Sequence, residues 1–347
     1  MKELYVTNAA DTKIIDSPIP KPGPDQVVIK VVVSGSNPKD WKSPEWGFPG
    51  NSGDDIGGIV HSVGDNVYEF KSGDRVAAFH EMRTDHGSFA EYALAWQHTT
   101  FHIPKTLSFE DAATLPLAAM TAAVGLFLHN RLNFPAPWAP QTRAVPLIVY
   151  GAATAVGAYT IQLARLANIH PIIGVAGRGI PFAEGLIDKS KGDAIVDYRG
   201  GDEAVIKGIK EALKAAGQEK VEYAFDAVSE KGSIENIFEV LARPGTITSV
   251  LPPERFAQTQ PFSYPEGITG SFTMVGDVHN DAKEFGFVYF RYIARMIFEG
   301  KFKQHPYEVI PGGLAGVSQG LQDLKAGKAS AVKYVFRVGE TEGAGQD

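Results

Sequence analysis

Residues 145–166 restrict the possible folds of this chain more than any other stretch. An apolar run of strand length, residues 145–150, ends at Gly151 and is followed by a turn of small residues. Apolar residues then recur at helical spacing, at Val156, Ile161 and Leu166. A buried strand, a tight turn and a helix are the opening elements of a dinucleotide-binding unit. In such a unit, a pyrophosphate lies against the positive end of the helix.

The glycine pattern of this turn departs from the usual G-x-G-x-x-G form. If Gly157 is the last glycine of the motif, Ala152 and Thr154 stand at the two earlier glycine positions. Small residues at these positions let the backbone come close to a phosphate. The pattern alone leaves two alternatives open, a dinucleotide-binding turn and an ordinary strand–helix turn with no ligand.

Composition indicates a globular protein of ordinary surface character. The chain has 347 residues, 44% hydrophobic and 21% charged, and this length is sufficient for two domains. A net charge of −7 does not favour a nucleic-acid partner, and no apolar run is long enough to cross a bilayer. The first residues lack a secretory apolar segment, and no cysteine is present for disulfides or thiolate metal sites. We therefore expect a cytoplasmic protein without membrane segments.

The N-terminal part favours short strands. Residues 4–15 predict a strand pair with a turn at 8–11, and the β-branched run at 26–33 predicts a further strand. Glycine turns separate apolar segments throughout residues 53–76, and residues 87–93 predict one more strand, so a small barrel is expected. Before them, Asp40 is a candidate cap for a short helix.

The remainder alternates between helices and strands, which predicts a parallel, doubly wound sheet. Residues 109–128 predict a helical region broken at Pro116, with Ser108 and Asp111 resembling a capping box. A proline-rich loop and a turn are expected at 133–146 and 243–245. The other expected elements are strands at 172–175, 194–196, 223–226, 246–250, 269–275 and 331–337, helices at 203–216, 232–241 and 285–299, and a frayed polar tail at 339–347.

Several motifs resemble those of the medium-chain dehydrogenase/reductase superfamily along the whole chain. The most specific is the glycine–valine pattern of residues 53–76, which ends in Gly-Asp-Arg-Val. Gly87-Ser-Phe-Ala-Glu-Tyr92 and the Leu115-Pro116 pair fit as well. The resemblance implies an α/β fold with two domains. A GroES-like β-barrel catalytic domain would comprise residues 1–118 and 277–347, and a Rossmann domain, a doubly wound parallel sheet that binds NADPH, would comprise residues 119–276.

Within that superfamily the chain resembles the zinc-free branch of quinone oxidoreductases, enoyl reductases and fungal trans-acting enoyl reductases of polyketide pathways. The turn Asn37-Pro-Lys-Asp-Trp-Lys42 is closest to the fungal group. In zinc alcohol dehydrogenases a cysteine stands at the position of Asn37, and a His-Glu pair stands at Asp54-Asp55. Because catalytic zinc needs thiolate and imidazole ligands, we expect no metal here. The four-cysteine structural zinc lobe is missing too.

The loop after the second predicted strand of the sheet bears on the choice of cofactor. NAD-binding sheets carry an acidic residue there for the ribose 2′-hydroxyl, but Gly177 and Arg178 occupy this loop. Arg178 can pair with a 2′-phosphate, which favours NADPH over NADH; the alternative is a solvated loop arginine. By resemblance, Tyr198 lies against the adenosine phosphate, with packing at a strand end as the alternative. The further candidates for cofactor contacts are Ala153, Thr154, Ala155 and Val156. By resemblance, Lys333 reaches the cofactor phosphates, and Val250 and Leu251 border the nicotinamide with their backbone groups. The alternative for these three is that they are plain residues of the sheet.

Two residues match functional positions of the fungal enoyl reductases. By resemblance, Lys42 contacts the cofactor or the substrate carbonyl, and Thr121 lies on the nicotinamide side or at the substrate carbonyl. The alternatives are a surface lysine and a helix-interior hydroxyl bonded to its own backbone. No role is assigned to His80, His86 or Tyr92. In the absence of a metal, hydrogen-bond donors must polarise the carbonyl.

Together, these features imply an NADPH-dependent reductase that transfers hydride to an activated C=C bond of an enone or enoyl thioester. A quinone oxidoreductase is the close alternative. A non-enzymatic NADPH-binding scaffold is the alternative from another class, and the altered glycine turn favours it. A polyketide synthase carrier domain is the partner expected for a trans-acting enzyme. The family implies a monomer or a homodimer, and no nucleic-acid or membrane partner is expected.

Overall fold

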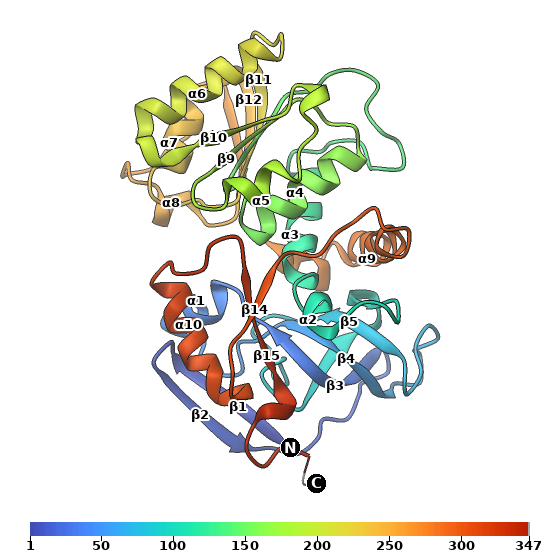
Figure 1. The fold of residues 1–347 in the computed structure, drawn as a ribbon. Helices are drawn as coiled ribbons and strands as arrows, with labels where there is room; N and C mark the ends of the chain where they lie inside the picture. The colour runs from blue at the N-terminus through green and yellow to red at the C-terminus, as the bar shows by residue number, and fades with distance from the viewer. Residues whose placement is uncertain (346–347) are drawn as a thin grey trace. The chain divides into compact units, whose positions relative to one another are not determined.

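The computed structural model describes residues 1–345 and divides the chain into two compact units (Figure 1). Unit 1 consists of residues 1–120 together with the chain from Gly276 onward, and unit 2 consists of Thr121–Val275. The first boundary falls inside helix α3 (Pro116–Phe127). Unit 1 is therefore discontinuous in sequence, whereas unit 2 is a single continuous segment.

Unit 2 contains a six-stranded parallel sheet in the order β10-β9-β8-β11-β12-β13. This strand order is that of a dinucleotide-binding Rossmann sheet, so the predicted doubly wound parallel sheet is confirmed. The strands are β8 (Leu147–Tyr150), β9 (Ile172–Ala176), β10 (Ala194–Asp197), β11 (Val221–Asp226), β12 (Leu241–Ser249) and β13 (Ile268–Phe272). The helices are α4 (Ala155–Leu166), α5 (Ile180–Glu184), α6 (Asp202–Ala215), α7 (Ser233–Phe238) and α8 (Pro253–Phe256).

Burial explains why these segments form a covered sheet. All four residues of β8 and all five of β9 are buried, as expected for parallel strands that are covered on both faces. Helix α6 buries Val205, Ile209 and Leu213, which lie four residues apart on one helical face. These three residues pack into a core with Ile148 of β8 and with residues of α7.

Three predicted boundaries in unit 2 are wrong, one of which is the end of the strand expected at 269–275, since this strand stops at Phe272. The helix expected at 232–241 ends at Phe238, and the strand expected at 246–250 begins at Leu241. The expected turn at 243–245 lies within β12, where the pairing with β11 jumps from Val221–Leu241 to Tyr223–Thr246. The proline and glycine therefore form a bulge in a strand instead of ending it.

Unit 1 is built on a seven-stranded sheet in the order β14-β15-β3-β4-β5-β7, with β6 paired to β3. Irregular pairing between β3 and β4 marks bulges, which bend a sheet around its core. The predicted GroES-like fold is confirmed. The strands are β3 (Gln26–Gly35), β4 (Asp55–Val63), β5 (Arg75–Phe79), β6 (Tyr92–Trp96), β7 (Thr100–His102), β14 (Tyr307–Val309) and β15 (Lys333–Arg337), beside a hairpin of β1 (Lys2–Asn8) and β2 (Asp11–Asp16). The helices are α1 (Lys39–Glu45), α2 (Phe109–Ala112), α9 (Lys283–Phe298) and α10 (Val317–Lys325), besides the first turns of α3.

The ends of several elements in unit 1 test the sequence predictions. The Ser108 hydroxyl accepts a hydrogen bond from the Asp111 N–H at 3.0 Å, so the predicted capping of α2 is confirmed. The strand expected at 87–93 begins only at Tyr92. The predicted frayed tail is wrong as far as Gly345, because Thr341 is buried and accepts a hydrogen bond from the Leu314 N–H. Residues 346–347 of that tail lie outside the described residues.

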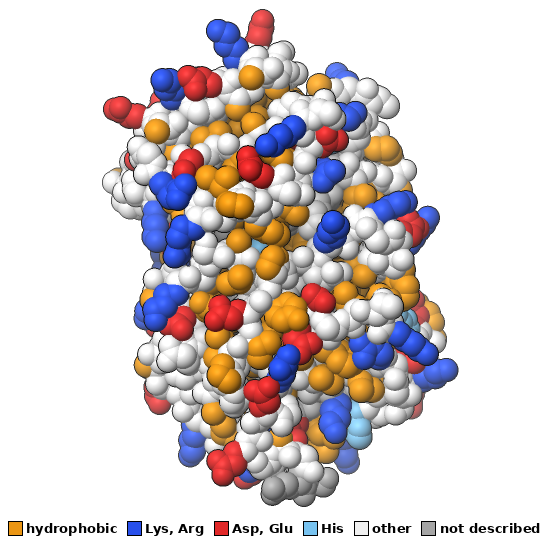
Figure 2. Space-filling view, viewed as in Figure 1, with side chains coloured by type: hydrophobic (Ala, Val, Ile, Leu, Met, Phe, Trp, Pro, Cys, Tyr) orange, Lys and Arg blue, Asp and Glu red, His pale blue; other side chains and the backbone are white. Residues whose placement is uncertain are grey.

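Surface features agree with the composition. Within residues 1–345, no helix is both long enough and apolar enough to span a membrane. On the face drawn in Figure 2, acidic and basic side chains are interspersed over most of the surface.

Candidate functional site

The predicted cofactor residues of unit 2 gather at one edge of its sheet. Because β8, β9, β10 and β12 run parallel, their carboxyl ends meet at the same edge, which is where open α/β sheets bind ligands. The segments that follow these strands, including the first turn of α4, carry the predicted residues Ala153, Thr154, Ala155, Val156, Gly177, Arg178, Tyr198, Val250 and Leu251.

The turn between β8 and α4 is shaped to bring the helix close to the strand. Gly151 has a φ of +85°, a conformation that favours glycine. A β-carbon on Gly157 would overlap the Gly151 carbonyl oxygen, so glycine is required there for close packing. The Thr154 hydroxyl caps α4 by accepting a hydrogen bond from the Gly157 N–H at 3.0 Å. Ala155 and Val156 follow in the first turn, where N–H groups have no partner within the helix and face an anion well.

The loops after β9 and β10 place a basic and an aromatic side chain together. Arg178 is exposed, and Tyr198 is 47% exposed. The Tyr198 ring lies against Gly177, whose β-carbon, if present, would be 2.5 Å from the ring. The nearest carboxylate at this edge by strand register is Asp197, which pairs with Ala176 at the end of β9.

Asp197 is hydrogen-bonded to Arg199, two residues further along the same loop. Its carboxylate accepts hydrogen bonds from the Arg199 guanidinium at 2.9 and 2.6 Å and from the Arg199 N–H at 2.9 Å. Hydrogen bonding by the Arg199 side chain, followed by that of its backbone, lowers the pKa of Asp197. The acidic group beside β9 is therefore bound to Arg199, and Arg178 is exposed at the same edge.

Sequence reasoning missed Asp226, which organises the loop after β11. Its fully buried carboxylate accepts hydrogen bonds from the Ser229 N–H at 2.8 Å and the Ser233 hydroxyl at 2.7 Å. Burial raises the pKa of Asp226 to about 6. The Ser229 hydroxyl in turn accepts from the Val250 N–H at 2.9 Å. The predicted backbone donor of Val250 is thus bound inside unit 2. A signal in the sequence could have identified Asp226. Of the two strands that flank β8, β9 ends in alanine and β11 ends in this acidic residue.

In unit 1, the positions aligned with zinc ligands hold buried ion pairs. The Lys333 amine lies 2.5 Å from Asp55 Oδ2 and 3.1 Å from Asn37 Oδ1, and Lys333 is only 4% exposed. The Asn37 amide also donates to Asp55 Oδ2 at 2.6 Å, and the Leu117 N–H donates to Asp55 Oδ1 at 2.7 Å. Lys333 was predicted to contact cofactor phosphates, and that role stays a prediction. The structure instead supports a role for its amine inside unit 1.

A second buried pair adjoins the first. The Lys39 amine lies between two carboxylates, in contact with Asp54 and 3.1 Å from Asp40 Oδ1. Burial raises the pKa of Asp40 to about 7 and that of Asp54 to about 6. Burial alone would lower the pKa of Lys39, but the charges of Asp54 and Asp40 outweigh it and raise that pKa.

Asp40 does not cap α1, contrary to the prediction. Pro38 is the N-cap residue, and Asp40 lies in the first turn, where its carboxylate accepts a hydrogen bond from the Asn37 N–H at 2.7 Å. Sequence reasoning gave no role to Lys39, because its partner Asp54 comes from another segment. Within residues 1–345, no three histidine, cysteine, aspartate or glutamate side chains are grouped to hold a metal ion.

The two predicted catalytic residues are both buried. Lys42 lies in α1, is 5% exposed, and has its amine 5.0 Å from the centre of the Trp41 ring. Thr121 lies in α3 and is also 5% exposed. Their catalytic roles stay predictions.

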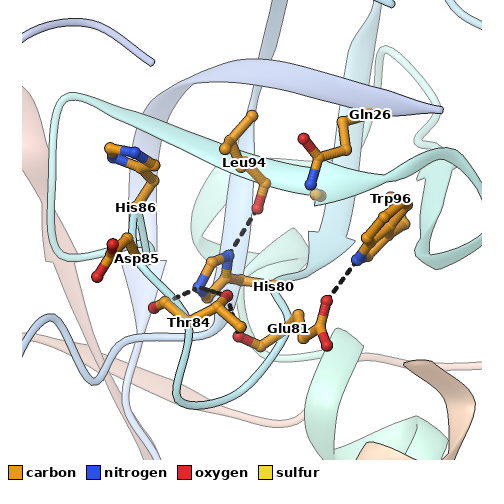
Figure 3. Close-up of a pocket in the computed structure, with 9 residues that line it drawn as sticks. Gln26, His80, Glu81, Thr84, Asp85, His86, Leu94 and Trp96 are labelled. Atoms are coloured by element: carbon orange, nitrogen blue, oxygen red, sulfur yellow. Dashed lines mark hydrogen bonds between the residues drawn. The ribbon is translucent and has the colours of Figure 1, made fainter. Parts of the chain in front are cut away.

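A small cavity in unit 1, of about 250 Å³, is lined by His80 and His86, the two histidines to which no role was assigned from the sequence (Figure 3). His80 Nδ1 is 2.7 Å from the Leu94 carbonyl oxygen, and its Nε2 is 3.2 Å from the Thr84 hydroxyl. Burial lowers the pKa of His80. With both ring nitrogens engaged by the protein, His80 has a structural role.

Comparison with known proteins places this geometry in a family. Residues 23–105 match the alcohol dehydrogenase GroES-like domain. The quinone oxidoreductase of Pseudomonas syringae pv. tomato DC3000 has a similar structure, with a TM-score of 0.75 and 21% identity over 96% of this chain and 99% of that one. This similarity shows the fold alone.

Two fungal proteins are similar in sequence. The chain is 47% identical to the trans-enoyl reductase fsr4 of Gibberella fujikuroi over 320 residues, which cover 91% of this chain and 92% of the relative. It is 30% identical over 361 residues to lovC of Aspergillus terreus, the enoyl reductase component of lovastatin nonaketide synthase, covering 97% of this chain and 93% of lovC. The protein therefore belongs to the trans-enoyl reductases of the medium-chain dehydrogenase/reductase superfamily.

Proposed function

We propose that the protein is an NADPH-dependent, metal-independent reductase that transfers hydride to the C=C bond of an enone or enoyl thioester. The observation that carries this proposal is the edge of the unit 2 sheet, where an exposed Arg178 follows β9 and the nearby Asp197 is bound to Arg199. Similarity to proteins named enoyl reductases supports alkene reduction as the chemistry.

The residues of unit 2 fit a dinucleotide that carries a 2′-phosphate. Gly151 and Gly157 allow α4 to begin close to β8, and the first-turn N–H groups of Ala155 and Val156 would hold the pyrophosphate. Arg178 would pair with the 2′-phosphate, and the Tyr198 ring would lie along the adenosine. When bound, NADPH supplies the hydride for the β-carbon of the substrate.

Lys42 is proposed to contact the cofactor or the substrate carbonyl, and Thr121 is proposed to lie on the nicotinamide side or at the carbonyl. Hydride addition to the β-carbon places negative charge on the carbonyl oxygen, and hydrogen-bond donors that face this oxygen lower the barrier. An amine and a hydroxyl that are each only 5% exposed are stronger donors than the same groups in water, because water screens them less. Solvent would supply the proton that reaches the α-carbon.

The proposed natural substrate is an enoyl chain bound to a polyketide synthase carrier domain. The name of lovC, an enoyl reductase component of a nonaketide synthase, supports this substrate class. We expect a carrier-bound enoyl thioester to react with a higher kcat/KM than the same acyl group on free pantetheine. Equal values would contradict recognition of the carrier.

The reaction is tested by following NADPH oxidation by the purified protein with three acceptors: a simple enone, a short enoyl thioester and a naphthoquinone. Turnover of the enone or thioester with formation of the saturated product supports the proposal. Turnover of the quinone alone would indicate a quinone oxidoreductase. Tight NADPH binding without oxidation by any acceptor, including the carrier-bound chain, would indicate a binding protein.

Cofactor preference is tested with Arg178→Ala. Loss of a charge-assisted contact with the 2′-phosphate should cost about 1.5–3 kcal/mol, so the NADPH/NADH ratio of kcat/KM should fall by about one to two decades. Arg143→Ala is the matched control, because Arg143 is an exposed arginine of unit 2 that lies before β8, away from the loops that follow the strands. An unchanged ratio in Arg178→Ala would refute the assignment.

A further inference from the structure

Helix α1, which carries Lys42, has little stability of its own. It spans only the seven residues Lys39–Glu45, contains Pro44, and has no side-chain cap at Pro38. Isolated helices of this length do not persist in water, because forming the first turn costs more than one hydrogen bond returns. The position of Lys42 therefore depends on contacts that α1 makes with the rest of unit 1.

Beside the packing of Trp41 on the core and the pair of Glu45 with Lys325, several of those contacts are made by Lys39 and Asp40, in the first turn of the helix. The Lys39 amine donates to the Ser52 carbonyl oxygen and contacts the Asp54 carboxylate. The Ser52 hydroxyl donates to the Asp40 carbonyl oxygen at 2.9 Å. The Lys39 side chain and the Asp40 carbonyl group, both in the first turn of α1, thus bind residues 52–54, directly before β4.

The Asp54 carboxylate makes Lys39 essential to this arrangement. Asp54 is 1% exposed, and neither of its carboxylate oxygens accepts a hydrogen bond of good geometry from residues 1–345. The ammonium of Lys39 is the cation in contact with it. A buried carboxylate with no other donor holds an ammonium strongly, since separating the two would leave an uncompensated charge in the interior.

We propose that Lys39 is a positioning residue: its bridge to Asp54 and Ser52 fixes α1 and thereby holds the Lys42 amine in its buried place. The bridge joins the segment of Asn37 to the segment of Asp54, and these are the positions at which zinc alcohol dehydrogenases, unlike this chain, carry zinc-ligand residues. Here a side-chain ammonium makes the connection. The importance of Lys42 for turnover rests on the proposed function, but the bridge itself does not.

The first measurement concerns the position of Lys42 and needs no turnover. Pulse labelling of amines with acetic anhydride, read by peptide mass spectrometry, gives the reactivity of Lys42 in the whole folded protein. The variants are Lys39→Met and the double variant Lys39→Met/Asp54→Asn, which removes the bridge without leaving a charge on residue 54. Lys13→Met, at an exposed position of β2, is the control for losing one lysine.

We expect Lys42 to be labelled several-fold faster in both Lys39 variants and at the wild-type rate in Lys13→Met. Wild-type labelling in the folded double variant would overturn the proposal, because Lys39 would then serve only to neutralise Asp54. If Lys39→Met alone does not fold, the double variant decides. Unchanged labelling in a folded Lys39→Met would also overturn it.

Kinetics then separate this proposal from the proposed function. With an enone substrate, displacement of Lys42 should lower kcat/KM about tenfold or more in the double variant, and Lys42→Met should lower it at least as much. If Lys42→Met turns over normally, the assigned role of Lys42 fails while the labelling result still stands. If Lys42→Met is impaired and the double variant is not, the positioning role fails and the assigned role of Lys42 survives.

Discussion

Replacing Lys333 by methionine should destabilise unit 1 without weakening NADPH binding. Lys333 was predicted from resemblance to reach the cofactor phosphates, but its amine lies 2.5 Å from Asp55 and 3.1 Å from Asn37. Methionine keeps much of the length of the side chain and removes only its charged end. The variant therefore separates a role in an ion pair from a role in cofactor binding.

The size of the effect follows from burial. Lys333 and Asp55 are 4% and 0% exposed, and removing one partner of such a pair typically costs about 3–5 kcal/mol. The Asn37 amide and the Leu117 N–H still donate to Asp55 in the variant, so we expect about 3 kcal/mol, the lower end of that range. Lys328→Met is the matched control. Its pair with Asp323 has nearly the same length, 2.6 Å, but Lys328 is 63% exposed, so its loss should leave the stability almost unchanged.

Guanidinium unfolding followed by tryptophan fluorescence measures this effect in the appropriate unit. Trp41, Trp46 and Trp96 all lie in unit 1, whereas Trp138 lies in unit 2. A titration of NADPH against the folded variant gives the second readout. A loss below about 1 kcal/mol, combined with NADPH affinity weakened by a decade or more, would refute the ion-pair assignment and support the predicted phosphate contact.

Two further predictions concern packing and pH. Gly157→Ala should destabilise unit 2 by about 1–3 kcal/mol in guanidinium unfolding. The added β-carbon would overlap the Gly151 carbonyl oxygen, which outweighs a gain of about 1 kcal/mol in helix propensity. A variant more stable than the wild type would contradict this close packing. Burial lowers the pKa of His279 to about 3, so the unfolded chain binds more protons than the folded one between that value and about 6.5, and stability should fall as pH decreases through this range. His279→Gln should weaken this acid-induced loss of stability when unfolding is measured at a series of pH values. An unchanged pH dependence in this variant would show that His279 is not the group responsible.

The order of elements in unit 2 could be predicted because each parallel strand is an apolar run ended by small or polar residues. Errors occurred where local turn signals competed with long-range pairing. Arg243-Pro-Gly245 has the composition of a turn, yet β12 continues through it because β11 resumes pairing at Thr246. Likewise, residues 339–345 are polar, but Thr341 is buried where its hydroxyl accepts the Leu314 N–H. Neither partner is visible from the local sequence.

The same contrast applies to the candidate site. Residues after β8, β9 and β10 could be predicted as a group, since the carboxyl ends of parallel strands meet at one edge whatever the loops contain. The pairs of unit 1 offered no such rule. Lys333 lies 278 residues from Asp55, and a lysine at the start of β15 gives no indication of its partner. Motif comparison could show that Asn37, Asp54 and Asp55 differ from the zinc ligands found at these positions in other proteins. It could not identify Lys39 and Lys333 as the cations that contact the two aspartates.

The charge balance of this cluster gives a physical reason for its two lysines. Asp40, Asp54 and Asp55 are essentially buried and close to one another, and three buried carboxylates cannot remain ionised without cations. Lys39 and Lys333 supply two positive charges, which leaves one negative charge in excess. Burial raises the pKa of Asp40 to about 7, so a proton on Asp40 can compensate that excess near neutral pH. At the positions aligned with zinc ligands, side chains of the protein can therefore balance the buried charge themselves, and the same ammonium groups hold the turn that leads to Lys42.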